Sequence, residues 1–366
     1  MALPRTKILD RYIVGKFLGT FIFTILIAVV IVVIFDLSQK IDKFVEKDVP
    51  LNEIVFDYYF GFIPWIVNSF SPLFVFISAI FFTSKLAQNS EIIAMLAGGV
   101  SFRRLMAPYM FSAGVICALS LVLGLYIIPP ANQKRLDFEN KYIKTQMIAA
   151  DNMRDIHYQL SPGEFVYVEQ FSRWANTAYR FTLERFEDKK LVSKLSAESA
   201  AWDTTFLGWR LKNYFIRDFY GESEMVRTGK QLDTVISLTI EDFYRRKNTP
   251  EYLSEKDLNE LIAVQDMRGD AQIKVSQIEK HNRIAMPFSA FVLTVIAVSL
   301  SSRKKRGGLG LNIGIGLALS FSYILFMRFS QMFVLKDIVS SPALAMWIPN
   351  IVFALIAAVL YHIAPK

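Results

Sequence analysis

Residues 85–104 read KLAQNSEIIAMLAGGVSFRR and lie between two long apolar segments of the chain. Ser90 or Asn89 can cap a helix here, and Glu91 in its first turn suits the positive helix end. Two consecutive glycines end the helix, because glycine is favoured just past a helix C-terminus. We therefore predict a short helix over residues 89–98 between two membrane spans.

A helix of about two turns is not stable alone in water, so this one must pack against another surface. Ile92, Ile93, Met95 and Leu96 give it an apolar side. That side can lie on the membrane domain of the same chain or on a second protein. From the residues alone, Glu91 either serves only the helix dipole or contacts a partner.

The composition is that of a membrane protein with a substantial part in water. The 366 residues are 53% hydrophobic, 20% are charged, and the mean hydropathy is +0.33. The net charge of +8 does not indicate nucleic-acid binding, because many basic residues lie at the ends of apolar segments. Cys117 is the only cysteine, so no intramolecular disulfide is possible.

Several apolar segments are long enough to cross a bilayer. They cover roughly residues 17–35, part of 56–86, 105–128, 284–300, 309–329 and 343–363. Prolines interrupt the second segment, and the fifth begins with Gly310, Gly314 and Gly316, whose spacing allows close helix contact. We expect the first to be a retained helix, because its core is too long for a signal peptide and no small-residue cleavage site follows.

The basic residues predict the topology of these six spans. They gather at the N-terminus, at Lys85, Arg103 and Arg104, in residues 303–306, and at Lys366. All of these positions fall on one side, so both termini are expected in the cytoplasm. The charged stretch 36–53 is then expected to form an external loop.

Residues 131–282 contain no apolar run long enough for a span and instead show period-two alternation. The alternating stretches are 164–171, 179–186, 194–202, 208–219 and 233–240. They predict antiparallel strands in a sandwich, jelly roll or partial barrel. The inward candidates of these strands are Phe165, Tyr167, Phe181, Leu183, Trp209, Leu211 and Phe215.

The predicted fold is therefore an α-helical membrane protein with an all-β external domain inserted between spans three and four. The predicted domains are residues 1–130 with the helix at 89–98, residues 131–282, and residues 283–366.

The sequence contains no pattern typical of a catalytic site. The phosphate-binding pattern GxxxxGK[ST] and the catalytic patterns HExxH and GxSxG are all missing, and the three histidines are dispersed. The predicted span centres carry no acids that would suggest a proton relay. We therefore predict a transport subunit without catalytic residues, metal or cofactor of its own.

Four stretches resemble the LptF/LptG (YjgP/YjgQ) permease family, and the similarity covers essentially the whole chain. They are LDRYI at 9–13, the long run SPLFVFISAIFFTSKLAQNSEIIAMLAGGVSFRRL at 71–105, FVYVEQF at 165–171, and the helix leading into the fourth span. Residues 86–99 are the most specific part. Asp10-Arg11-Tyr12-Ile13 is more similar to LptG than to LptF. Fewer glycines in the second span and many phenylalanines depart from the family pattern.

The resemblance implies a function in the inner membrane of a Gram-negative bacterium. Family members pair as LptF with LptG on a dimeric cytoplasmic ATPase, LptB. The complex extracts lipopolysaccharide from the outer leaflet and passes it to periplasmic jelly-roll proteins, starting with LptC. The external β-domain would then be jelly-roll-like and periplasmic, and no nucleic acid is involved.

Three groups of site residues are predicted. The resemblance implies that Glu91 and the helix around it couple to the ATPase, and the ATPase-coupling group is Ser90, Glu91, Ile92, Met95, Arg103 and Arg104. Lys40 and Lys43 lie at the external end of the first span, where they either meet lipid head groups or form local ion pairs with Asp36 and Asp42. The acyl-path group is Phe165, Tyr167, Phe181 and Leu183, which either line an acyl-chain path or only pack in the core of the β-domain.

Two other classes of function stay open. One is a permease of the same architecture that moves another lipid or a lipoprotein. The other is a membrane-anchored enzyme or periplasmic scaffold whose β-domain carries the function. Co-purification of an ATPase separates the permeases from the scaffold, and the identity of bound lipid separates the two permeases.

Overall fold

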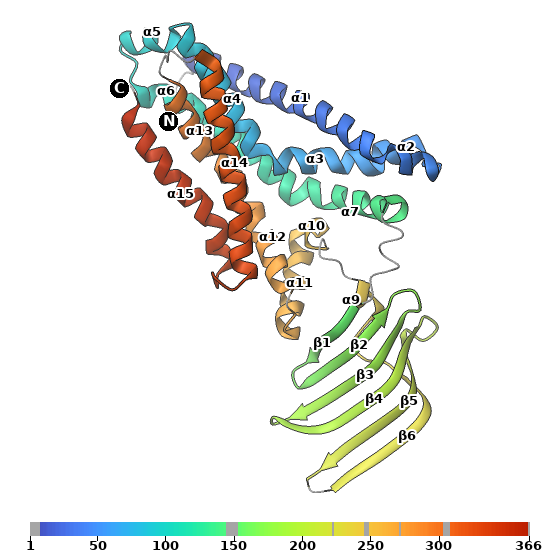
Figure 1. Cartoon of the computed structure of the whole chain (residues 1–366). Helices are drawn as coiled ribbons and strands as arrows, with labels where there is room; N and C mark the ends of the chain where they lie inside the picture. The colour runs from blue at the N-terminus through green and yellow to red at the C-terminus, as the bar shows by residue number, and fades with distance from the viewer. Residues whose placement is uncertain are drawn as a thin grey trace, which may run out of the picture. The chain divides into compact units, whose positions relative to one another are not determined.

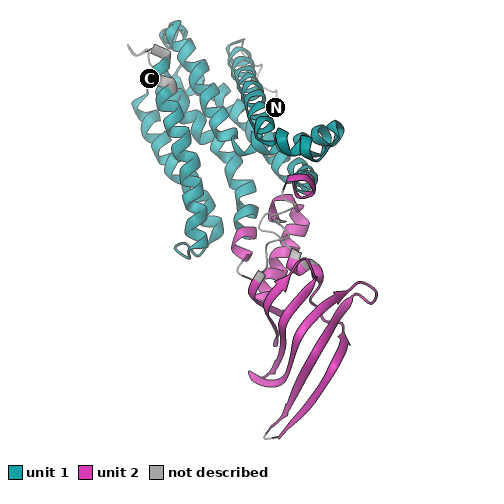
Figure 2. Cartoon of the chain, turned by 45° about the vertical axis from the view of Figure 1, so that its right-hand side comes forward, with its two compact units in different colours: residues 1–136, 277–366 teal, residues 137–276 magenta. Residues whose placement is uncertain are grey.

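The computed structural model describes residues 8–143, 153–221, 223–244, 249–270, 272–302 and 308–364. The chain forms two compact units, each with a core of its own. One contains residues 1–136 and 277–366, and the other contains residues 137–276 (Figure 2).

Six helices among the described residues are long and apolar enough to cross a membrane. They are α1 (Ile8–Glu46), α4 (Ser71–Gln88), α6 (Phe102–Val122) with its extension α7 (Ile128–Phe138), α12 (Ile273–Ala285) with α13 (Ser289–Ser301), α14 (Gly308–Leu335) and α15 (Pro342–Ile363) (Figure 1). The π-helical turns Leu123–Ile127 and Glu139–Ile143 flank α7, and the 3-10 turn Met286–Phe288 joins α12 to α13. Together with a separate antiparallel sheet in the middle of the chain, these helices confirm the predicted fold class. The basic run at 303–306 lies outside the described residues. Helix α14 begins just after it, at Gly308.

The first helix corrects the prediction of an external loop over residues 36–53. Helix α1 continues to Glu46, and only a short connection precedes α2 (Leu51–Glu53). The continuation is helical because Phe44 is buried and the Asp36–Lys40 ion pair has helical spacing. Lys40 and Lys43 therefore lie on a helix.

The second predicted span is made of two helices. The π-helical turn Ile54–Tyr59 leads into α3 (Phe60–Ser69), and α4 begins one residue later. Phe70 lies between them with φ −103° and ψ 10°, and a proline follows in the first turn of α4. Proline fits a first helical turn because the N–H that it lacks would have no partner there.

The core of the membrane unit lies around α13, which packs against α4, α6 and α15. The 3-10 turn leaves the Ala285 carbonyl to accept a hydrogen bond from Asn350 Nδ2 at 2.7 Å, and Tyr323 donates to Asn350 Oδ1 at 2.8 Å. Such bonds satisfy backbone groups that lipid cannot. Close contact occurs at Gly316, where a Cβ would collide with Ile80; Gly314 has open space around it.

The second unit holds one antiparallel sheet whose six strands follow chain order (Figure 1). The strands are β1 (Met153–Ser161), β2 (Glu164–Ser172), β3 (Thr177–Glu187), β4 (Lys190–Asp203), β5 (Gly208–Tyr220) and β6 (Ser223–Thr234). Among the described residues of this unit, the sheet is followed by α9 (Ile240–Tyr244), α10 (Thr249–Tyr252), α11 (Glu255–Arg268) and the start of α12.

The predicted strand at 233–240 is wrong, and β1 and β6 were not predicted. Strand β6 is an edge strand with mostly exposed side chains, so it lacks an alternating apolar pattern. The apolar residues that follow it cover the sheet instead. Phe243 is buried and stacks on Phe171 at 4.1 Å, and Trp209 Nε1 donates to the Leu238 carbonyl at 2.7 Å.

A row of six polar residues crosses the whole sheet, one from each strand; we call it the crease row. It consists of Asp155, Glu169, Arg180, Glu198, Asn213 and Lys230. The registers of all five strand pairs skip these positions. The members from β1, β3 and β5 have left-handed backbones, with φ of 52°, 50° and 49°. Residues other than glycine rarely adopt such φ values. The alignment of three of them across the sheet therefore marks a regular irregularity of the β-bulge kind and not a chance deviation.

The crease row changes the phase of the inward-facing positions. On β3 the buried residues next to it are Phe181 and Ala178, and on β4 they are Ala197 and Ala200. In each strand they are three positions apart, whereas an unbroken strand has a spacing of two. Two successive rows of side chains, one of them the crease row, therefore point outward between two rows that point inward. The inward-pointing rows on both sides of the crease row remain on one apolar face of the sheet.

Candidate functional site

The predicted short helix is present as α5 (Glu91–Ala97), between α4 and α6. Its start differs from the prediction: Ser90 has φ 64° and its side chain makes no capping hydrogen bond. Asn89 does not cap the helix either; its Nδ2 donates to Glu91 Oε1 at 3.1 Å. The end is as predicted, with Gly98 at the C-cap and Gly99 at φ 85°.

Helix α5 has a covered side and an open side. Ile92 is 1% exposed and belongs to the core of the membrane unit, and Met95 and Leu96 pack against that core. Ile93 is 52% exposed. The helix is therefore supported by its own chain, and its open side is available for a second protein.

Two contacts join this region to the first turn of α1. The Tyr12 hydroxyl donates to Glu91 Oε2 at 3.1 Å. Arg104 donates from both terminal nitrogens to Asp10, at 2.7 and 2.6 Å, which is the bidentate geometry that arginine and carboxylate favour. Tyr12 and Asp10 belong to the LDRYI stretch, so two of the sequence stretches that carry the family resemblance meet here. Sequence reasoning missed this contact.

We call the α5 helix, its flanking turns and the first turns of α1 and α6 the coupling corner. Within it, Glu91 and Arg104 contact α1, and Ile92 and Met95 pack on the membrane core, whereas Arg103 is exposed. The corner thus holds the six predicted coupling residues, and several of them are already in intramolecular contacts.

The predicted head-group lysines have different surroundings. Lys40 Nζ lies 2.6 Å from Asp36 Oδ1 and 4.5 Å from the Tyr58 ring centre, and it also contacts the Tyr58 hydroxyl. That hydroxyl is within 3.0 Å of Asp36 Oδ2. Lys43, one turn further on, is exposed. Only Lys43 therefore presents its charge freely to solvent or a head group.

The four predicted acyl-path residues do not share one face of the sheet. Phe181 is fully buried and Leu183 packs on the same core. Phe165 is 40% exposed on the opposite face, and Tyr167, also on that face, donates to Asp155 Oδ1 at 3.1 Å. The prediction that Phe165, Tyr167 and Phe215 point inward is wrong: Phe165 and Phe215 are 40% exposed, and Tyr167 shares the outward face of Phe165, because the alternating Val166 and Val168 take the buried positions of β2.

An apolar cavity of about 290 Å³, half-open to the surroundings of the protein, lies between α1, α3 and α4 of the membrane unit. Val29 and Val32 of α1 line one side, and Ile66 of α3 and Phe74 of α4 line the other. The break between α3 and α4 at Phe70 also borders it. Its lining has no polar group, so hydrocarbon suits it and water does not.

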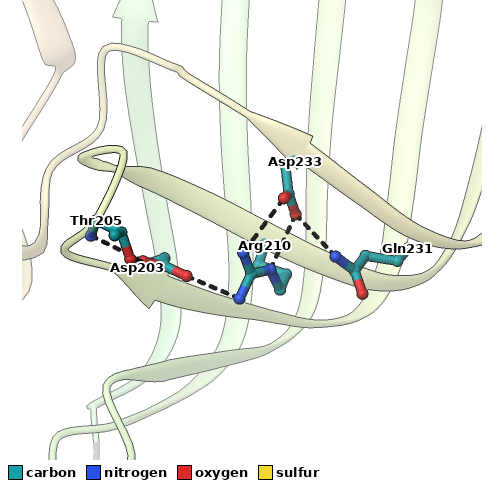
Figure 3. A network of polar contacts seen from close by, with 5 residues as sticks. All are labelled: Asp203, Thr205, Arg210, Gln231 and Asp233. Carbon is teal, nitrogen blue, oxygen red and sulfur yellow. Dashed lines mark hydrogen bonds and ion pairs between the residues drawn. The ribbon is translucent and has the colours of Figure 1, made fainter.

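A polar network on the sheet links β4, β5 and β6 (Figure 3). Arg210 pairs with Asp203 at 2.7 Å and with Asp233 at 3.1 Å. Hydrogen bonds from the hydroxyl and backbone N–H of Thr205, and then the guanidinium, hold the pKa of Asp203 below its usual range. Arg210 is shared between two carboxylates, and each charged group of the network has a partner within it, which indicates a structural role.

The family model of the lipopolysaccharide export system permease LptF/LptG matches residues 11–362. The chain belongs to this family. A comparison with curated proteins gave no match. Family membership makes the chain a transport subunit of lipopolysaccharide export and, with its six apolar helices, a multi-pass inner-membrane protein. The greater similarity to LptG than to LptF stays a prediction.

Proposed function

We propose that this LptF/LptG-family permease works in an ATP-driven exporter with three kinds of partner. A paralogous, LptF-like permease subunit completes the membrane part, and an LptB-like cytoplasmic ATPase dimer supplies the energy. An LptC-like periplasmic jelly-roll protein receives the lipopolysaccharide. The family match supports the export role, and the geometry of the coupling corner supports the ATPase partner.

The observation that carries the ATPase proposal is the half-covered helix α5. Its seven residues are too few to form a helix without support, and Ile92 anchors it to the membrane core. Ile93, Ala94 and Ala97 are left exposed on its other side. An exposed apolar side on a short supported helix is suited to dock into a groove of a partner.

The proposed orientation rests on what gathers at the coupling corner. The first turn of α1 contacts α5 and α6, and Phe102 packs against Tyr361 near the end of α15, with ring centres 5.6 Å apart. Lys85 lies in the last turn of α4 and Arg103 in the first turn of α6, on either side of α5. Basic residues favour the cytoplasmic side, so we assign this end to the cytoplasm and the sheet to the periplasm.

The lipid path is proposed from the opposite end of α1 onward. Lys43, and Lys40 once released from Asp36, would contact head-group phosphates with charge-assisted hydrogen bonds. Acyl chains would then follow the apolar face of the sheet that contains Phe181 and Leu183. Phe165 and Tyr167 lie on the other face of β2 and would contact an acyl chain only from that side.

The test is purification of the chain from its native membrane, followed by identification of bound proteins and lipids. We expect an ATPase to co-purify and mass spectrometry to identify lipopolysaccharide. Glu91→Lys should abolish ATPase co-purification, because charge reversal adds repulsion to the loss of a contact. Glu260→Lys, the same change at an exposed site on α11, is the matched control and should retain the ATPase.

Three results would contradict the proposal. Co-purification of the ATPase with Glu91→Lys at the level of the control would exclude α5 as the docking element. Recovery of a different lipid would favour the permease for another substrate. Purification without any ATPase would favour the scaffold.

A further inference from the structure

Helix α1 is packed differently along its length. In its first third, Ile13, Phe17 and Phe21 are buried at intervals of four residues, and α1 packs there against α4 and α6. Beyond the hydrogen bond between Ser78 and Thr24, at 3.2 Å, the apolar cavity opens beside α1. The middle of the helix is therefore loosely packed although its beginning is not.

The loose middle lies between two attachments. At one end, Asp10 and Tyr12 join α1 to the coupling corner. At the other, Asp36 accepts hydrogen bonds from Tyr58 and Tyr59, at 3.0 and 3.3 Å, which joins α1 to the π-helical turn before α3. Between them most large side chains of α1 face away from the bundle.

Close-packed interiors transmit displacement, and cavities permit it. A helix of 39 residues is about 60 Å long and moves largely as one body. Displacement of its first turn therefore reaches its middle, where the cavity allows α1 to move toward or away from α3 and α4 without overlap of side chains.

The two contacts at the coupling corner are suited to pass on such a displacement. A bidentate pair fixes the orientation of the guanidinium as well as its distance from the carboxylate. The Tyr12–Glu91 hydrogen bond adds a second point on the same turn. Two points of attachment prevent α1 from pivoting freely when α5 and α6 move.

We propose that Asp10 and Tyr12 are positioning residues that transmit movement of the coupling corner to α1 and thereby change the width of the apolar cavity beside it. The inference rests on the proposed function, because it requires α5 to be the element that the ATPase moves. It adds a transmission element on α1 that touches neither the nucleotide nor the lipid.

The experiment uses the full complex reconstituted in vesicles that contain lipopolysaccharide. Two quantities are measured on each variant: the rate of ATP hydrolysis and the lipopolysaccharide released per ATP. For Asp10→Asn and Tyr12→Phe together, we expect hydrolysis to persist and release per ATP to fall about fivefold or more, as for loss of a typical coupling free energy.

Three further variants separate transmission from stability. Arg104→Lys keeps the charge but not the bidentate geometry and should release an intermediate amount per ATP. Asp10→Arg combined with Arg104→Asp restores an ion pair and should recover release. Arg11→Gln removes an exposed charge from the same turn and should behave as wild type.

The outcomes distinguish this inference from the proposed function. If no ATPase co-purifies with the wild-type chain, the proposed function fails. If the ATPase binds and Asp10→Asn with Tyr12→Phe releases as much lipid per ATP as wild type, the inference is overturned. If the charge-exchanged variant assembles and hydrolyses ATP but stays uncoupled, the ion pair is not the transmitting contact. Should Asp10→Asn fail to assemble, the charge-exchanged variant and Arg104→Lys still decide between these results.

Discussion

Ion pairs have different tasks in the membrane unit and in the sheet. At the coupling corner, Asp10 and Arg104 are far apart in sequence, and their pair joins the first turn of α1 to α6. In the sheet, pairs such as Arg185–Glu164 join neighbouring strands that backbone hydrogen bonds already hold together. The sheet pairs add to a register that exists without them, whereas the corner pair defines how two helix ends meet.

The largest expected effect is the difference in melting temperature between two variants, one that breaks the ion pair at the coupling corner and one that breaks an ion pair of the sheet. Arg104→Met leaves the Asp10 carboxylate, whose side chain is only 20% exposed, without its guanidinium, whereas Arg185→Met removes a largely solvated partner of Glu164. We expect Arg104→Met to lower the melting temperature of the purified chain clearly more than Arg185→Met, which should be close to wild type. Thermal unfolding in detergent measures both; equal shifts would contradict the distinction.

The second prediction separates the two lysines at the outer end of α1. Lys43→Glu alone should reduce co-purified lipid, because Lys43 is exposed. Lys40→Glu should add less, because Lys40 first has to leave Asp36. Quantitative mass spectrometry of bound lipid, with the co-purified ATPase as internal reference, measures the difference. Undiminished lipid in the double variant would show that neither lysine meets the head group.

The third prediction concerns the crease row. At an ordinary strand position glycine is less stable than alanine by roughly 0.5–1 kcal/mol. At Arg180, with φ 50°, the order should reverse, because alanine is strained in a left-handed backbone and glycine is not. Thr182, two residues along β3, is the control for the ordinary order. Denaturant unfolding of Gly and Ala variants at both sites checks the reversal, and the same order at both would contradict it.

Loss of the ion pair at the same site should be a smaller effect. Arg180 and Glu169 are 2.7 Å apart but well exposed, so Glu169→Gln should change the free energy of unfolding by less than about 1 kcal/mol. Unfolding at two salt concentrations is the measurement. A loss well above that range would mean that the crease depends on its charges and not on its backbone.

The smallest predicted effect is a pH dependence at the rim of the sheet. Hydrogen bonds from Ser193 and then Arg227 lower the pKa of Asp218 from its ordinary value of 3.8. A carboxyl group whose pKa is lower when folded stabilises the fold fully above its unfolded pKa, and this stabilisation is lost as the pH falls through the folded pKa. We therefore expect the contribution of Asp218 to the free energy of unfolding to stay constant between pH 7 and 5 and to fall below about pH 4. Asp218→Asn should flatten this part of the stability curve; an unchanged curve would contradict the assignment.

Much of this molecule could be predicted from local sequence. Apolar runs long enough for a bilayer predicted the spans, because lipid requires every backbone group of a span to be satisfied within it. Gly98 and Gly99 predicted the end of α5, because few other residues adopt the backbone that ends a helix there. Period-two alternation predicted β2 to β5, which each bury one face.

Three features depended on contacts between residues distant in the chain. The capping role predicted for Ser90 did not occur, and the corner is held instead by Asp10 and Tyr12 from α1. Phe165 and Tyr167 were predicted to point inward, but the apolar Val166 and Val168 alternate with them, so the face that β2 buries follows only from its pairing with β3. The ion pair between Lys40 and Asp36 was one alternative in the sequence, whereas the contact of Lys40 with Tyr58 of a following π-helical turn was not predicted.

The sequence by itself determined the number and approximate positions of the membrane spans, the break around α5 and the presence of an inserted sheet, because these depend on hydrophobicity, helix ends and alternation over a few neighbouring residues. Only the tertiary structure decided how far α1 extends, which charges are paired, which face each strand buries and where an apolar cavity borders α1. Pairing depends on distances across the fold, and the crease row shows the physical limit most clearly: left-handed residues on three strands must align before the inward phase can change across a whole sheet.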